Sequence, residues 1–199
     1  YTRNMMNSLP TTLPLSKLVT EMQESATLKM AKMARELKAQ GKDVIDLSLG
    51  EPDFDTPVHI KEAAKKALDD GYTKYTPVNG LLELRQAIVN KLARENDLHY
   101  TVNQIVVSNG AKQSVYNLCM ALLDPGDEVI LPAPYWVSYA EIVKMAGGVP
   151  VIANSSIEQD FKSTPEEIEA LITDRTKFIL YSSPCNPSGS VFSFEELQA

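Results

Sequence analysis

The chain has 199 residues, 44% hydrophobic and 23% charged, which is typical of a globular protein with one hydrophobic core or slightly more. Its net charge of −7 argues against a nucleic-acid partner, because phosphate backbones select basic surfaces. Two cysteines and two histidines are too few for a disulfide framework or a metal cluster, and no apolar run reaches the length of a membrane span. We therefore expect a cytoplasmic protein with no membrane or nucleic-acid partner, while a small anionic ligand stays open.

The first elements are an arm, a helix and a short strand. Residues 1–15 are polar and contain proline, which indicates an extended arm. Apolar residues at helical spacing predict a helix over 27–40, with Gly41 as its C-terminal cap. The apolar segment 44–50, VIDLSLG, is expected to form a strand.

Two more helices follow. Thr56 and Pro57 are a cap and a first-turn proline for a helix that runs to about Asp70. The pair Asn79-Gly80 predicts a turn, and an apolar stripe over 81–92 predicts the next helix.

From residue 104 onward, short apolar segments alternate with helical patterns. The expected strands are 104–108, 128–132, 149–153 and 177–182, and the expected helices are 111–123, 139–145 and 165–172. Thr164 and Glu167 form a capping box for the last of these helices. Strands separated by single helices predict βαβ units and a mostly parallel α/β sheet.

A second capping box, Ser193 with Glu196, predicts a helix close to the end of the sequence. The chain stops at Ala199, after less than two turns of that helix, and short helices depend on tertiary support. We expect the chain to be a fragment of a longer protein. Its incomplete sheet would then have a free edge, which favours self-association.

Three stretches follow expected strands and carry candidate chemistry. In 106–114, VVSNGAKQS, a glycine precedes a helix start, which is a candidate phosphate cup or a plain βα turn. It matches neither the phosphate loop of NTPases nor the GxGxxG dinucleotide motif. The stretch 132–139, PAPYWVSY, contains Trp136, and 181–189, YSSPCNPSG, contains Asn186. Alone, the Trp136 stretch is more often core or interface packing, and the Asn186 stretch is equally well explained as a turn that ends a buried strand.

Together the three stretches meet the needs of a phosphorylated planar heteroaromatic cofactor. N–H groups at a helix start bind the phosphate, and the ring of Trp136 offers a stacking face. The amide of Asn186 offers a donor to a ring oxyanion. Because ligands bind at the carboxyl ends of parallel strands, we expect all three groups at one edge of the sheet.

Five segments, in this order and spacing, resemble the class I/II aminotransferases, which are pyridoxal 5′-phosphate (PLP) enzymes of fold type I. They are LSLGEPDFDTP, TKYTPVNGLLELR, SNGAKQ, LDPGDEVILPAPYWVSY and SPCNPSG. The resemblance implies an arm and the first part of a small domain over 1–49. It implies a truncated PLP-binding large domain over 50–199, with a mostly parallel sheet flanked by helices.

The resemblance also implies cofactor-binding residues. Backbone groups of Gly110, Ala111 and Lys112 would hold the phosphate. Trp136 would stack on the pyridine ring, and Asn186 would hydrogen-bond its 3′ oxygen.

Tyr75, by the same resemblance, would reach the phosphate of the other subunit in a homodimer. Gly50 would contact the substrate carboxylate, beside Lys112, Trp136 and Asn186. The substrates implied are an amino acid and a 2-oxo acid. Residues 25–27, SAT, and Lys112 together resemble a bacterial aspartate aminotransferase subgroup, so we expect aspartate or a similar acidic donor, with a neutral aromatic or alanine-like substrate as the alternative.

The same resemblance places the Schiff-base lysine, the carboxylate that protonates the pyridine nitrogen and the arginine that binds the substrate beyond Ala199. We therefore expect no catalytic residue in this chain and no activity from it alone. Two alternatives remain: another fold type I PLP enzyme, such as a β-lyase or a cyclopropane-forming synthase, and a non-catalytic dimerisation module.

Overall fold

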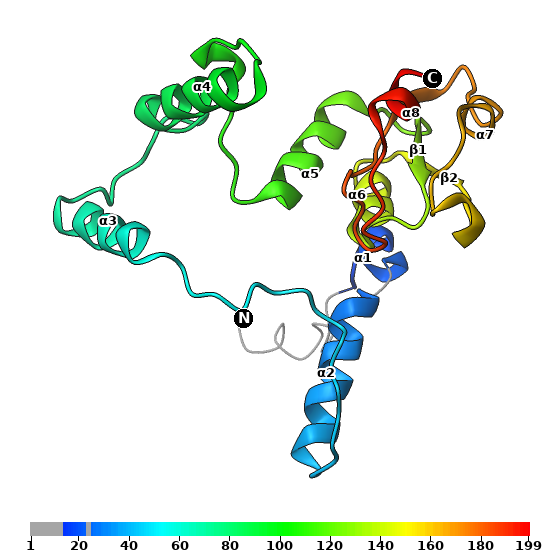
Figure 1. Ribbon diagram of the computed structural model, residues 1–199, viewed down its shortest axis with the longest axis horizontal. Coiled ribbons are helices and arrows are strands. Elements are labelled where there is room, and N and C mark those ends of the chain that lie inside the picture. The colour runs from blue at the N-terminus through cyan, green and yellow to red at the C-terminus, as the bar shows by residue number, and fades with distance from the viewer. Residues whose placement is uncertain (1–13, 23–24) are drawn as a thin grey trace, which may run out of the picture. The chain divides into compact units, whose positions relative to one another are not determined.

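The structure is a computed structural model that describes residues 14–22 and 25–199 (Figure 1). The arm predicted over 1–15 therefore lies almost wholly outside the described residues. The α-helices are α1 Lys17–Glu21, α2 Ala26–Ala39, α3 Val58–Asp69, α4 Leu82–Asn96, α5 Ala111–Leu122, α6 Ser138–Met145, α7 Pro165–Glu169 and α8 Phe194–Gln198. The strands are β1 Glu128–Pro132, β2 Val149–Ala153 and β3 Thr176–Ile179, and the 3-10 helices are η1 Val102–Gln104 and η2 Ile157–Gln159.

The chain divides into two compact units. The sheet unit contains the described residues up to Ser48 together with Leu122–Ala199, and the helical unit contains Leu49–Ala121.

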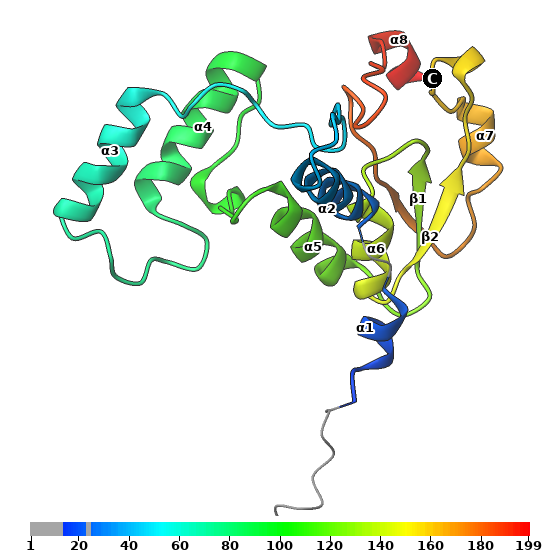
Figure 2. The same ribbon diagram turned by 90° about the horizontal axis from the view of Figure 1, so that it is seen from below.

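In the sheet unit the three strands are parallel and ordered β2-β1-β3, with β1 and β2 side by side in Figure 2. The central strand β1 is buried along its whole length, and Val129, Ile130 and Leu131 are 0% exposed. A parallel strand covered on both faces needs a continuous apolar run rather than an alternating one. Each of these side chains contributes about 1.5–3 kcal/mol by burial. The predicted parallel α/β sheet is confirmed.

Helix α6 packs against this sheet through Ile142 and Val143, which are both buried. Two glycines follow the helix, one required by its backbone conformation and the other by close packing. Gly147 has a φ of 87°, a conformation that glycine adopts without strain. A Cβ at Gly148 would lie 2.9 Å from the Leu123 side chain and 3.0 Å from that of Val143, so glycine is what allows β2 to begin this close to α6.

In the helical unit, Arg85 of α4 is only 8% exposed. Its Nε donates to the carbonyl of Gly80 at 3.2 Å and its Nη1 to the carbonyl of Val102 at 2.8 Å. The Val107 N–H donates to the Asn79 carbonyl at 3.2 Å. One buried guanidinium therefore connects the predicted turn at Asn79-Gly80 to α4 and η1.

Two predicted strands do not form. Residues 44–50 are irregular, and in 104–108 the last residue of η1 is followed by irregular backbone, because within the described residues neither segment has a neighbouring strand to pair with. In 44–50 the Asp46 carboxylate instead accepts hydrogen bonds from the N–H and hydroxyl of Ser48, a local alternative to a ladder. The segment before Gly110 is therefore not a strand of the sheet. We predicted that the turn at Gly110 lies at the sheet edge because we expected a strand there, and that strand is absent.

The predicted helices are present, with changes at some ends. Helix α3 has Pro57 rather than Thr56 at its N-cap position. Helix α7 ends at Glu169, three residues early, because the next turn tightens to bonds between residues three apart. Both predicted capping boxes, at Thr164 and Ser193, are confirmed.

Candidate functional site

The loops that leave β1 and β3 carry two of the predicted cofactor-binding residues. Both strands end at the same edge of the sheet because they are parallel. Four residues after β1 ends, Trp136 lies half-buried, and its ring meets Tyr139 edge to face with centroids 5.5 Å apart. Asn186 follows β3 and is exposed. Trp136 and Asn186 therefore belong to one unit.

The loop over 181–190, the Asn186 loop, is held by its own hydrogen bonds. The Cys185 N–H donates to the Ser190 carbonyl, and the Gly189 N–H to the Cys185 carbonyl, both at 2.8 Å. The Asn186 N–H donates to the Ser182 hydroxyl at 3.2 Å. The side-chain amide of Asn186 forms no hydrogen bond within the described part of the chain, so it can donate to a ligand.

Cys185 connects the Asn186 loop to the loop after β1. Its Sγ lies 3.2 Å from the Pro134 carbonyl, to which the thiol donates. Beneath this contact a cavity of about 10 Å³ is lined by residues that include Tyr135, Phe161 and Phe192. That volume is at the lower limit for one water molecule, so the loops are closely packed on each other.

The predicted phosphate cup lies in the helical unit. Gly110 has a φ of 85°, which strains any residue with a Cβ, and α5 begins at the next residue. The Asn109 N–H donates to the Gln113 side chain at 2.5 Å, which satisfies one N–H just before the helix. Gly110, Ala111 and Lys112 are all exposed. A helix start with exposed backbone and a positive-φ glycine is a geometry that suits an anion.

Gly50 and Tyr75 also belong to the helical unit, and both are exposed. Tyr75 lines an open cavity of about 330 Å³ with neighbours that include Tyr72 and Lys74. The predicted residues thus fall into two groups: Trp136 with Asn186 in the sheet unit, and Gly50, Tyr75 and the 110–112 turn in the helical unit.

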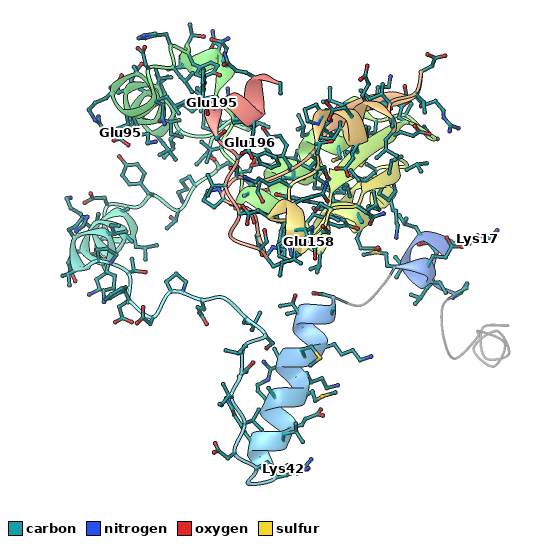
Figure 3. All side chains as sticks on the ribbon, turned by 45° about the vertical axis from the view of Figure 1, so that its right-hand side comes forward. Lys17, Lys42, Glu95, Glu158, Glu195 and Glu196 are labelled. Atoms are coloured by element: carbon teal, nitrogen blue, oxygen red, sulfur yellow. The ribbon has the colours of Figure 1, made fainter. Side chains whose placement is uncertain are left out.

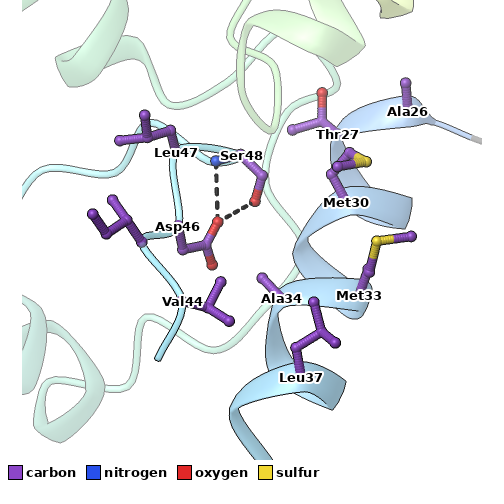
Figure 4. A pocket seen from close by; sticks show the side chains of 11 residues that line it. Ala26, Thr27, Met30, Met33, Ala34, Leu37, Val44, Asp46, Leu47 and Ser48 are labelled. Atoms are coloured by element: carbon purple, nitrogen blue, oxygen red, sulfur yellow. Dashed lines mark hydrogen bonds between the residues drawn. The ribbon is translucent and has the colours of Figure 1, made fainter. Parts of the chain in front are cut away.

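A groove of about 530 Å³ lies between α2 and the segment 44–48 (Figure 4). Its walls are mostly apolar, with Met30 and Met33 on the helix side. The Asp46 carboxylate is its charged group, and the Ser48 hydroxyl bound to it lowers the pKa of Asp46 below its ordinary value. None of the predicted site residues lines this groove.

A charged cluster that the sequence reasoning missed lies behind the Asn186 loop. Lys162 pairs with Glu196 at 2.7 Å and with Asp160 at 3.5 Å. The capping box at Ser193 indicated a capping role for Glu196. No sequence pattern indicates that Glu196 also pairs with Lys162, which lies 34 residues away.

Other site types find no support in the described ranges, 14–22 and 25–199. No group of three or more histidine, cysteine or acidic side chains there could hold a metal ion. No helix there has both the length and the apolar character needed to cross a bilayer.

Comparisons with known proteins give one family. The family described as "Aminotransferase class I and II" matches residues 42–199. An aspartate/prephenate aminotransferase of Nitrosomonas europaea is 53% identical over 94% of this chain and 47% of its own length. An aspartate aminotransferase of Geobacillus stearothermophilus is 50% identical, with 94% and 48% covered.

Solved structures agree. The aspartate aminotransferase of Thermus thermophilus with maleate has a TM-score of 0.89 and 48% identity, over 94% of this chain and 49% of that one. The aspartate aminotransferase of Rhizobium meliloti has a TM-score of 0.89 at 45% identity, over 94% and 47%. The chain spans about half the length of the proteins it matches.

Proposed function

The chain belongs to the class I and II aminotransferase family, and we propose on that premise that it supplies cofactor-binding residues for the transfer of an amino group from an acidic amino acid to a 2-oxo acid. The fold is that of the fold type I PLP transferases, and the family uses PLP. The observation that carries the proposal is the exposed Asn186 amide, held by a hydrogen-bonded loop that is packed on the loop bearing Trp136.

The residues present fit this cofactor. The half-buried indole of Trp136 offers a face on which a pyridine ring can stack. The Asn186 amide can donate to the 3′ oxygen of that ring. At this helix start the Gly110 N–H already donates to the Ser108 carbonyl at 2.9 Å, while the exposed backbone at Ala111 and Lys112 and the positive end of the helix dipole suit a phosphate.

PLP, when bound, supplies an electron sink for reactions at the substrate Cα. The part of this chain is to bind and orient. Trp136 would stack on the ring, and Asn186 would donate to the 3′ oxygen and stabilise its negative charge. In the helical unit, the 110–112 turn would bind a phosphate group.

For the substrate we propose aspartate or a similar acidic amino acid, with contacts from Gly50 and Lys112. The relatives support this donor, since they are named aspartate/prephenate aminotransferase and aspartate aminotransferase. The ammonium of Lys112 would favour a distal carboxylate over a neutral side chain. The fully exposed ring of Tyr75 supports a role toward the other subunit of a homodimer.

The division into a first part of a small domain over 1–49 and a partial large domain over 50–199 stays a proposal. So do a cytoplasmic location, which the two free cysteines support, and the lack of catalytic activity of the chain alone.

A chimera tests the function. Residues of this chain replace the matching half of the Nitrosomonas europaea enzyme, to which they are 53% identical. We expect turnover of aspartate with a 2-oxo acid. Lys112→Ala should lower kcat/KM for aspartate by about tenfold, the effect of one charge-assisted contact, and change it little for alanine. A folded, PLP-loaded chimera without aminotransferase activity would contradict the proposal.

The sites are tested separately by PLP binding to this chain, measured by calorimetry. Asn186→Ala should weaken binding by about tenfold or more, since the amide donates to a charged oxygen. Asn117→Ala, which removes another exposed amide from α5, is the matched control and should leave the affinity unchanged.

A further inference from the structure

Lys162 contacts the segment that follows the Asn186 loop, at Val191 and Glu196, and also Asp160, which is bonded to the loop. Its Nζ donates to the Glu196 carboxylate of α8 at 2.7 Å and to the Val191 carbonyl at 3.4 Å, and it lies 3.5 Å from the Asp160 carboxylate. The side chain is only 18% exposed, whereas lysine side chains are mostly exposed. A largely covered lysine side chain with three acceptors around its ammonium connects parts of the structure rather than acting as a free surface charge.

Asp160 contacts both Lys162 and the Asn186 loop. The hydroxyl of Ser190, a residue only 9% exposed, donates to Asp160 at 3.4 Å. The Ser190 carbonyl accepts from the Cys185 N–H at 2.8 Å, and the next residue along is Asn186. An ion pair between Lys162 and Asp160, followed by hydrogen bonds of Ser190 to Asp160 and to Cys185, therefore leads from Lys162 to the residue beside Asn186.

The backbone turns sharply after η2, at Asp160 and Phe161, just before Lys162. The 3-10 helix η2 ends there, and Asp160 and Phe161 both have positive φ, 53° and 55°. Aspartate accepts this conformation readily, but for phenylalanine it is strained. The Phe161 side chain lines the small cavity under Cys185 and Ser190, so its packing offsets that strain.

Glu196 connects Lys162 to helix α8. Its second carboxylate oxygen accepts from the Ser193 N–H at 2.6 Å, so one carboxylate both caps α8 and pairs with Lys162. Figure 3 labels Glu196 on this helix. The Phe192 N–H donates to the Ser183 hydroxyl at 3.0 Å, which joins the segment before α8 to the first half of the Asn186 loop.

We propose that Lys162 is a positioning residue, which, through Asp160 and Glu196, holds the Asn186 loop in the conformation that aims the Asn186 amide at the cofactor ring. The inference rests on the proposed function, because it takes Asn186 as the donor to PLP. Lys162 itself touches no reacting atom in this proposal. It acts by keeping the 190–196 segment, and hence the loop closed by the Cys185–Ser190 hydrogen bond, in place.

The test uses two substitutions at Lys162 and a double-mutant cycle in this chain. Lys162→Met keeps the straight apolar stem and removes the ammonium, and Lys162→Arg keeps the charge. Lys144→Met is the control, because the Lys144 ion pair with Glu141 lies within helix α6 of the same unit. Each variant is measured for PLP affinity by calorimetry and for amide hydrogen exchange at residues 185, 189 and 192.

Lys162→Met should weaken PLP binding by about tenfold and speed exchange at these amides by a similar factor, since coupled groups in one network interact on this scale. Lys162→Arg should restore most of both, and Lys144→Met should change neither. In the Asn186→Ala background, Lys162→Met should weaken PLP binding no further, because its effect passes through that amide.

Two results would overturn the proposal. One is unchanged exchange at the three amides in Lys162→Met, since the contacts of Lys162 then do not hold the loop. The other is a loss of affinity on Lys162→Met that is equally large without Asn186, since Lys162 then acts by another route. Failure of the proposed function looks different: Asn186→Ala binds PLP as well as the wild type, while Lys162→Met still speeds exchange.

Discussion

Glu128, the first residue of β1, forms a salt bridge of 2.5 Å with Arg175, the residue before β3, across the sheet. The Glu128 side chain is 6% exposed, while that of Arg175 is 68% exposed. The second Glu128 oxygen accepts from the Thr173 hydroxyl at 2.6 Å. Both oxygens of this buried carboxylate are therefore occupied, and they connect the starts of two neighbouring strands.

Glu128→Ala should lower the free energy of unfolding by about 2–3 kcal/mol, because it removes two charge-assisted hydrogen bonds. Urea unfolding followed by circular dichroism measures the change. Glu62→Ala is the control, because its ion pair with Lys65 is exposed, and such pairs contribute about 0–1 kcal/mol. Equal losses in the two variants would contradict the structural role of Glu128.

Gly80→Ala should destabilise the chain more than Gly71→Ala. Both glycines have positive φ, 95° and 82°, so the two variants share the backbone strain. Only at Gly80 would the new Cβ collide, 2.6 Å from Cγ2 of Val107, whereas nothing lies within 4 Å at Gly71. Overpacking of this kind costs about 1–3 kcal/mol, which is the expected difference between the two urea-unfolding energies. If the two variants have the same stability, the close contact between Gly80 and Val107 is absent in solution.

The pairing of Glu196 with Lys162 predicts a loss of stability in acid. The Lys162 ammonium is the main cause that holds the pKa of Glu196 below its ordinary value of 4.5. A carboxyl group with a depressed folded pKa contributes stability that is fully present above the ordinary value and is lost as pH falls through the folded value.

Glu196→Gln isolates this contribution, because glutamine can keep the capping bond to Ser193 but carries no charge. The wild type should be more stable than Glu196→Gln at neutral pH, and the difference should shrink as pH falls below 4.5 and through the lowered folded pKa of Glu196. Urea midpoints over this range measure it. A difference independent of pH would mean that the ion pair contributes nothing to stability.

Borohydride reduction of the chain with PLP should label no single lysine stoichiometrically. We expect the Schiff-base lysine to lie outside these residues, so labelling should be weak and spread over exposed lysines. Peptide mass spectrometry gives the distribution, with PLP-free reduction as the control. Saturable labelling of one lysine would show that this expectation is wrong, and Lys112 would be the first residue to test, because it lies at the proposed phosphate site.

Local signals in the sequence determined much of the fold. The capping boxes at Thr164 and Ser193 form as predicted, since each needs only residues three positions apart. The parallel sheet also followed, because a fully buried central strand such as β1 has a continuous apolar run that the sequence displays. The motifs around Trp136 and Asn186 were found in the same way, as short stretches next to strand ends.

Only the tertiary structure decided which apolar segments became strands and how the Asn186 loop is held. Segments 44–50 and 104–108 have strand-like sequences, but a strand exists only where a neighbour completes its hydrogen bonds, and that neighbour is not encoded in the segment itself. The contacts of Lys162 with Val191 and Glu196 join residues 29 and 34 positions apart. A charge on the printed sequence gives no sign of its partner, because pairing over such a separation depends on how the whole unit packs.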